Sequence, residues 1–107
     1  VGAAAIEGIE NIHADLFFMG VTGIHPDAGL TTGDFEEACI KRAFSGRAAE
    51  TVVLASPEKI NTASSFVIGD VSSVNTIIVE DGTDKEWIRA VSEKGVSVVL
   101  ASDRDSL

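Results

Sequence analysis

The chain has 107 residues, of which 45% are apolar and 23% charged, and its 17 acidic and 8 basic side chains give a net charge of −9. This length accommodates one domain whose core needs neither a disulfide nor a structural metal. The acidic surface excludes DNA and anionic membranes as direct partners. A single cysteine and two histidines exclude a disulfide framework and a zinc site of usual spacing, and no apolar run has the length of a membrane span.

The first third of the chain is predicted to form a helix, a strand and a long loop. The opening helix is weakened by Gly8, and its apolar positions are Ala5, Ile6, Ile9 and Ile12. The apolar run at residues 16–19 has the length of a strand. Residues 20–33 contain four glycines and a His25-Pro26-Asp27 turn, which predict a long shaped loop.

The middle third is predicted to form a helix, a strand and a polar connection. The helix begins near Asp34, with Glu37 three residues on, and ends at about residue 48 or 49. Its buried positions are Phe35, Ala38, Ile40, Ala43 and Phe44. An apolar strand follows at residues 51–55. The polar connection over residues 56–75 holds a candidate short strand at residues 66–68.

The last third is predicted to place a helix between two strands. The strands are the apolar runs at residues 76–79 and 96–101. Thr83 and Glu86 have the spacing of a capping box, and Gly95 is positioned to end the helix. Its apolar face consists of Trp87, Ile88 and Val91.

The four apolar runs lack the alternation of a strand with one wet face. Runs of this kind are typical of a parallel sheet that helices cover on both faces, so the sequence predicts an α/β fold with an open, mostly parallel sheet. Ligands of such sheets bind beyond the carboxyl ends of the strands. The loops after Met19, Ala55 and Val79 are therefore the expected positions of a site.

Two segments offer groups that could bind an anion or a sugar. The loop from Gly20 carries glycines and the Thr31 and Thr32 hydroxyls into a helix N-terminus, which suits an anion; alternatively, the glycines permit turns and Thr32 or Asp34 caps the helix. Lys59 follows a strand end and could bind a phosphate or carboxylate; alternatively, it is a solvated lysine or the partner of a nearby acid.

The remaining polar residues indicate structure more than chemistry. Glu36 and Glu37 complement the dipole at a helix start, and Glu37 and Lys41 have the spacing of an ion pair. His13 and His25 are interpreted as surface or packing residues, and Cys39 as a small core residue. The sequence specifies no catalytic base and nucleophile pair, Walker loop or dinucleotide fingerprint.

Several short motifs occur in one order along nearly the whole chain. They are Ala14-Asp15-Leu16-Phe17-Phe18-Met19-Gly20, Gly23-Ile24, Gly29-Leu30-Thr31-Thr32, Glu37-Ala38 with Lys41-Arg42-Ala43, Val52-Val53-Leu54-Ala55 with Lys59, and Val74-Asn75-Thr76-Ile77-Ile78-Val79. The series resembles the C-terminal sensor domain of DeoR-family bacterial transcriptional regulators.

The resemblance implies a fold shared with ribose-5-phosphate isomerase, glucosamine-6-phosphate deaminase and CoA transferases. It implies an effector-binding and oligomerising domain of a cytoplasmic regulator, chiefly a repressor, that senses a phosphorylated sugar or related metabolite without a cofactor or metal. Operator DNA would be bound by an N-terminal winged helix-turn-helix. That reader and the first part of the sensor domain would precede Val1. The apolar start of the chain has no basic segment before it and no initiator methionine, which predicts a cut chain and not a signal peptide. The implied effector-binding residues are Thr22, Gly23, Thr31, Thr32, Glu36, Lys41 and Lys59.

Two departures from the family pattern lie beside the expected site. Ser56-Pro57-Glu58-Lys59 stands where the family has Asp-Ser-Ser-Lys, and Thr32-Gly33-Asp34 stands where it has Thr-Pro-Asp. These changes suggest a different effector or an altered site. Two other functions stay open: a sugar-phosphate isomerase or deaminase, which would need an acid/base pair, and a purely structural dimerisation domain.

Overall fold

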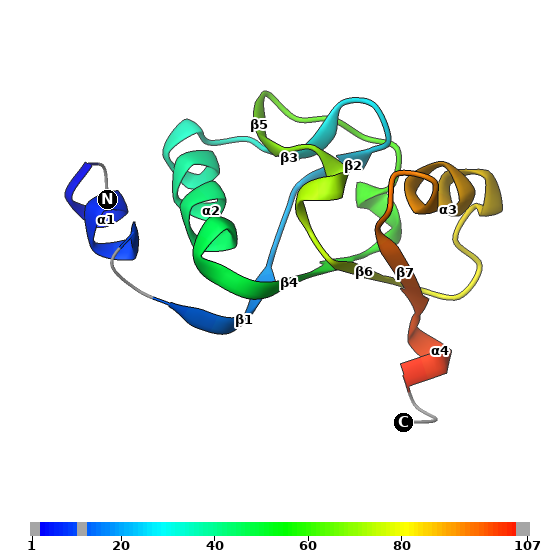
Figure 1. The fold of residues 1–107 in the computed structure, drawn as a ribbon. Helices are drawn as coiled ribbons and strands as arrows, with labels where there is room; N and C mark the ends of the chain where they lie inside the picture. Colours follow the sequence, from blue (N-terminus) through cyan, green and yellow to red (C-terminus); the bar gives the residue numbers. More distant parts are fainter. Residues whose placement is uncertain (1–2, 11–12, 105–107) are drawn as a thin grey trace.

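A computed structural model of the chain describes residues 3–10 and 13–104. These residues form a parallel sheet, an antiparallel sheet and helices packed beside them (Figure 1). The elements are α1 (Ala3–Glu10), β1 (Ala14–Met19), β2 (Gly23–His25), β3 (Gly29–Thr32), α2 (Phe35–Arg47), β4 (Ala48–Ala55), β5 (Phe66–Gly69), β6 (Thr76–Val79), α3 (Lys85–Ser92), β7 (Ser97–Leu100) and α4 (Ala101–Arg104), with 3-10 turns at Pro57–Lys59 and Val71–Ser73. Within the described ranges, no helix is long and apolar enough to cross a membrane.

The larger sheet has four parallel strands in the order β1-β4-β6-β7. The four predicted apolar runs form these strands, and the predicted α/β class with a mostly parallel sheet is confirmed. The chain moves across the sheet in one direction. Because crossovers between parallel strands are right-handed, such a series places its connections on one face, and α2, α3 and the small sheet all lie above the four strands in Figure 1.

The sequence predicted that helices cover both faces of this sheet, and for the described residues this prediction was wrong. Side chains of the inner face, such as Met19 and Val53, are buried, whereas alternate residues point to an open outer face. Leu16, Phe18 and Leu54 on that face are 45%, 56% and 50% exposed. The apolar runs are continuous because both faces are apolar, although the described chain covers only one.

The expected long loop at residues 20–33 was also wrong, because most of it forms a β-hairpin. β2 and β3 pair antiparallel, and β5 adds to the other edge of β3. Gly29 adopts a φ of 89° at the hairpin, a conformation in which a side chain would be strained. An isolated bridge between Ile24 and Ile60 connects this small sheet to the segment after β4.

The core lies between the inner face of the large sheet and the small sheet. Its fully buried members include Ile24 and Leu30 of the hairpin, Val53 of β4 and Ile77 of β6. Trp87 of α3 fills the remaining space and is 2% exposed. Its indole Nε1 donates a hydrogen bond to the Ile24 carbonyl at 3.3 Å, so the polar group of this buried ring is satisfied.

The helix ends agree in part with the sequence. Asp34 caps α2, and its carboxylate accepts a hydrogen bond from the Glu37 backbone N–H at 3.1 Å. The predicted Thr83 cap was wrong: Asp84 caps α3, while the Thr83 hydroxyl donates to the Glu80 carbonyl. Asp is at least as good an N-cap residue as Thr, so α3 begins one residue later than predicted.

The opening helix forms as predicted and packs against α2. Ile9 is 7% exposed, as the apolar pattern requires. Ile12 and the side chains of Ala5 and Ile6, which were predicted to share this face, lie outside the described part of the chain.

Candidate functional site

All four strands of the large sheet end at one edge. Met19, Ala55, Val79 and Leu100 are the last residues of the strands, and the segments that follow β4, β6 and β7 border two hollows. Because the peptide chains leave the sheet here, side chains from different loops can converge on one ligand. This edge, which the sequence predicted as the place of a site, is the candidate functional site.

The first hollow contains the predicted lysine. A cleft of about 370 Å³ lies at the ends of β4 and β6, lined by Leu54, Ala55, Ser56, Lys59, Ile78, Val79, Glu80 and Ala101. Lys59 ends the 3-10 turn after β4 and is half-buried. Within the described residues its ammonium group takes part in no hydrogen bond or ion pair. A cationic group is therefore available in a cleft at this edge.

The charge around Lys59 is mixed. The Ser56 hydroxyl donates a hydrogen bond to Glu58 Oε2 at 2.6 Å, and this bond, helped by the Lys59 charge, holds the pKa of the Glu58 carboxyl below its usual value. Glu58 is thus ionised at neutral pH, and Ser56 is oriented toward it. Glu80 adds a second carboxylate within the cleft. The cleft offers one cation and an acceptor for hydroxyl groups.

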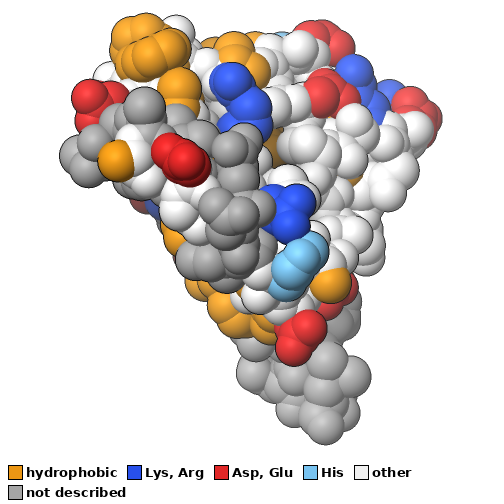
Figure 2. Space-filling view, turned by 60° about the vertical axis from the view of Figure 1, so that its left-hand side comes forward, with side chains coloured by type: hydrophobic (Ala, Val, Ile, Leu, Met, Phe, Trp, Pro, Cys, Tyr) orange, Lys and Arg blue, Asp and Glu red, His pale blue; other side chains and the backbone are white. Residues whose placement is uncertain are grey.

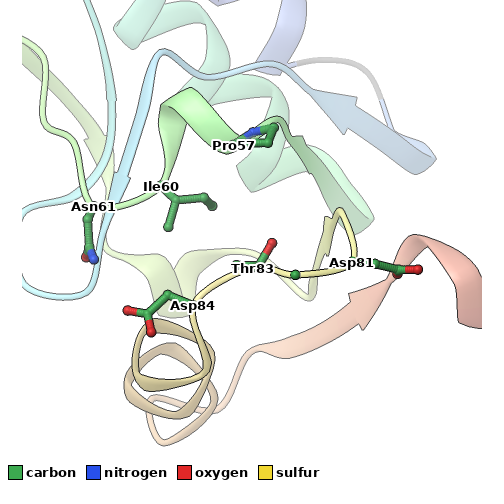
Figure 3. Close-up of a pocket in the computed structure, with 7 residues that line it drawn as sticks. Pro57, Ile60, Asn61, Asp81, Thr83 and Asp84 are labelled. Carbon is green, nitrogen blue, oxygen red and sulfur yellow. The ribbon is translucent and has the colours of Figure 1, made fainter.

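A second hollow of about 340 Å³ lies beside the loops after β4 and β6 (Figure 3). Its lining combines the apolar Pro57 and Ile60 with the polar or acidic Asn61, Asp81 and Asp84. Both carboxylates have roles in the fold, since Asp84 caps α3 and Asp81 accepts a hydrogen bond from the Ser102 backbone N–H. An anion is therefore less favoured here than beside Lys59.

Lys41 of α2 extends its side chain to the end of β1, but its ammonium group already has partners. It donates to the Gly20 carbonyl at 2.7 Å and forms an ion pair with Glu37 at 2.8 Å. The predicted pair of Glu37 and Lys41 is confirmed. Arg42, the next residue, donates to the carbonyls of Val67 and Ile68 in β5. These two cations connect α2 to the loop after β1 and to the small sheet.

Three more of the predicted site residues are buried in the small sheet. Thr31 is 1% exposed, and its hydroxyl donates to the Gly23 carbonyl at 3.3 Å while it accepts from the Ser64 backbone N–H at 2.8 Å. Thr32 is 2% exposed. A Cβ at Gly23 would lie 2.5 Å from the Thr62 carbonyl oxygen, so close packing requires glycine there.

The other two predicted residues, Thr22 and Glu36, are exposed. The Thr22 backbone N–H donates to the Thr31 carbonyl at 2.9 Å, which extends the hairpin. Glu36 lies in the first turn of α2. The predicted residues are thus distributed over the end of β1, the small sheet and the cleft, and no hydrogen bond among the described residues joins Lys59 to Thr31 or Thr32.

Sequence reasoning missed Glu80 and Ala101, which line the Lys59 cleft. A signal for Glu80 was present, because it directly follows a predicted strand at the edge where ligands bind. Ala101 was placed inside the last predicted strand. It instead begins α4, where the chain turns away from the sheet.

The family can now be assigned from comparison with known proteins. A family model described as the DeoR C terminal sensor domain matches residues 1–81, which is more than half of the chain. The chain belongs to this family. The resemblance that the ordered motifs indicated is therefore confirmed, and the parallel sheet agrees with it.

Similar curated proteins are transcriptional regulators. The chain is 28% identical over 102 residues to a protein of Escherichia coli O157:H7 named as an aga operon transcriptional repressor, with 95% of this chain and 38% of that protein covered. It is 30% identical over 93 residues to the HTH-type transcriptional regulator GolR of Listeria innocua, with 87% and 37% covered.

A third relative is the glycerol-3-phosphate regulon repressor of Haemophilus influenzae, which is 25% identical over 104 residues, with 97% of this chain and 40% of the repressor covered. The chain thus spans about two fifths of the length of the relatives it matches. The comparisons place it among sensor domains of DeoR-type regulators.

Proposed function

We propose that this chain is the effector-binding and oligomerisation domain of a repressor that senses a phosphorylated sugar or a related small metabolite. The observation that carries the proposal is Lys59, whose unpaired ammonium group lies in the cleft at the ends of β4 and β6. A phosphate needs a cation and several hydrogen-bond donors. Its binding is strongest where the cation is not already paired with another group.

The distribution of the other cations supports this choice. Lys41 is paired with Glu37, Arg42 donates to β5 carbonyls, and Arg89 is held between Glu86 and Glu93. Each would have to leave a partner before it could bind a ligand. Lys59 would not. The nearby Glu80 carboxylate suits the hydroxyl groups of a sugar, because its oxygens accept hydrogen bonds and sugar hydroxyls can donate them.

The names of the relatives support the class of ligand and the role of the whole protein. The Haemophilus influenzae relative is named for a glycerol-3-phosphate regulon, which involves a small phosphorylated polyol. We assign operator binding to the part of the regulator outside these 107 residues, since a net charge of −9 opposes contacts with DNA phosphates. We place the regulator in the cytoplasm and assign it no catalytic activity.

Isothermal titration calorimetry against a panel of sugar and polyol phosphates tests the proposal. A charge-assisted hydrogen bond contributes roughly 1.5–3 kcal/mol, so Lys59→Ala is expected to weaken binding about 10- to 150-fold. Lys85→Ala is the matched control, because Lys85 is an exposed lysine of α3 that has no partner among the described residues and its loss changes the net charge equally.

Equal affinities of wild type and Lys59→Ala would refute the role of Lys59. Absence of binding to every phosphate, with tight binding of an unphosphorylated sugar, would refute the ligand class. We expect NMR spectra of the same mixtures to show unchanged pentose and amino-sugar phosphates, and conversion of either would favour an enzyme.

A further inference from the structure

We propose that the effector is a phosphorylated amino sugar, and that Glu80 selects it by binding the ammonium group of the ligand. The inference rests on the proposed function, because it takes Lys59 as the group that binds the phosphate. It adds a chemical class of effector and a specificity-determining residue to the same cleft. Its basis is the pair of opposite, unpaired charges that line this cleft.

Lys59 and Glu80 line one cleft but are not paired with each other. Lys59 follows β4 and Glu80 follows β6, and these neighbouring parallel strands are about 4.8 Å apart. Among the described residues, neither charged group takes part in a hydrogen bond or an ion pair. The Glu80 backbone carbonyl accepts from the Thr83 hydroxyl, but the carboxylate does not take part in this bond. A ligand in the cleft therefore meets one free cation and one free anion.

The loops beside the cleft carry more negative than positive charge. On the α1 side of the molecule, basic and acidic side chains are interspersed (Figure 2). The loops at residues 56–65 and 80–84 instead contain one lysine, Lys59, and four carboxylates, Glu58, Glu80, Asp81 and Asp84. A sugar phosphate that has only hydroxyl groups is attracted by Lys59 and repelled by these carboxylates. An ammonium group on the ligand replaces the repulsion at Glu80 by an attraction.

An amino sugar phosphate supplies a partner for both free charges. Its phosphate oxygens accept hydrogen bonds from Lys59, and its ammonium group donates charge-assisted hydrogen bonds to Glu80. The sugar ring keeps the two ionic groups apart, and its C–H groups can contact the apolar part of the lining, which includes Leu54, Ile78 and Ala101. A volume of about 370 Å³ lies within the range of small-molecule sites.

Isothermal titration calorimetry with three ligands of one skeleton tests the inference. Glucosamine 6-phosphate has the ammonium group, glucose 6-phosphate has a hydroxyl in its place, and N-acetylglucosamine 6-phosphate has a neutral amide. The three galactose analogues are measured in parallel, so that either configuration of the ring is sampled. We expect wild type to bind one of the two amino sugar phosphates at least about tenfold more tightly than its neutral analogues, because only the ammonium group forms the charged bond.

Glu80→Gln tests the residue, because glutamine keeps the shape of the side chain and removes its charge. It should abolish the preference for the ammonium group, while the affinity for the hydroxyl analogue stays the same or increases. Glu50→Gln is the matched control, since Glu50 is an exposed acid near the other end of β4 and its loss changes the net charge equally. This variant should keep the preference. Far-UV circular dichroism verifies that both variants are folded.

The outcomes separate this inference from the proposed function. Equal affinities of wild type for the three members of each series would overturn the inference and leave Lys59 as a phosphate-binding residue. Binding of other sugar phosphates, with none of these six bound, would overturn it in the same way. A preference that Glu80→Gln retains would refute the role of Glu80. Tight binding of glucosamine or of a free amino acid, with no phosphate bound, would refute the proposed function itself.

Discussion

Gly23 is expected to be one of the least replaceable residues of the fold. An ideal Cβ at this position would lie 2.5 Å from the Thr62 carbonyl oxygen and 2.8 Å from Thr31 Oγ1. Both distances are below any contact that a methyl group tolerates. The Thr62 oxygen belongs to the backbone and cannot rotate away, and Thr31 Oγ1 is held by the Gly23 carbonyl and the Ser64 N–H. Gly23→Ala must therefore separate the hairpin from the segment after β4.

The energy of this separation follows from the contacts that are lost. Forcing an extra methyl into a packed site costs about 1–3 kcal/mol, and weakening the Thr31 hydrogen bonds adds about 1 kcal/mol. We expect Gly23→Ala to lower the free energy of unfolding by about 2–4 kcal/mol. For a domain of this size each 1 kcal/mol corresponds to a decrease in Tm of about 4–8 °C.

Urea denaturation followed by tryptophan fluorescence measures this loss, because Trp87 donates to the Ile24 carbonyl next to Gly23. Gly33→Ala is the matched control: no atom lies within 4 Å of the added Cβ, and the backbone is not in the left-handed region. It should be neutral or stabilising by up to about 1 kcal/mol. Equal stabilities of the two variants would refute the packing argument.

Two further predictions concern side-chain hydroxyls. Thr31→Val should lower the free energy of unfolding by about 1–3 kcal/mol, because the Ser64 N–H loses its acceptor. Thr31→Ser keeps the hydroxyl and should retain more of the stability. If urea denaturation finds the valine variant as stable as the serine variant, the Thr31 hydroxyl does not stabilise the fold. Asp70 accepts hydrogen bonds from the Ser72 hydroxyl and backbone N–H, which lower its pKa from 3.8. Its contribution is thus present above pH 3.8 and is lost as the pH falls through the lower folded pKa, so Asp70→Asn should flatten the loss of stability in acid; an unchanged pH profile would refute this.

The strands could be predicted from the sequence, but their environment could not. The apolar runs at 16–19 and 51–55 correctly indicated parallel strands, because strands of parallel sheets are typically apolar almost without interruption. The same runs gave no sign that Leu16, Phe18 and Leu54 face outward, since composition does not tell which face is covered. The hairpin was missed because β2 and β3 have three and four residues, too few to show a period.

The candidate site could also be predicted only in part. The position of Lys59 at a strand end could be predicted, because it depends only on following a strand, which the local sequence reveals. Its role in effector binding stays a prediction. The burial of Thr31 depends on Ser64, which is distant in the chain, so that its hydroxyl looked equally suited to a ligand. Asp84 in place of Thr83 as the cap of α3 is a smaller error with a local origin, because adjacent residues competed for one position.

The central position of β3 in the small sheet has a consequence for the order of folding. Thr31 pairs with Gly23 on one side and with Val67 on the other, so the first contact closes a short stretch of chain and the second a long one. The longer closure costs about 1 kcal/mol more in chain entropy. The hairpin can form early from local sequence, whereas β5 must close a longer stretch of chain, which includes α2 and β4, before it pairs with β3. The small sheet is therefore completed late, and its third strand is a sensitive reporter of whether the whole chain has folded.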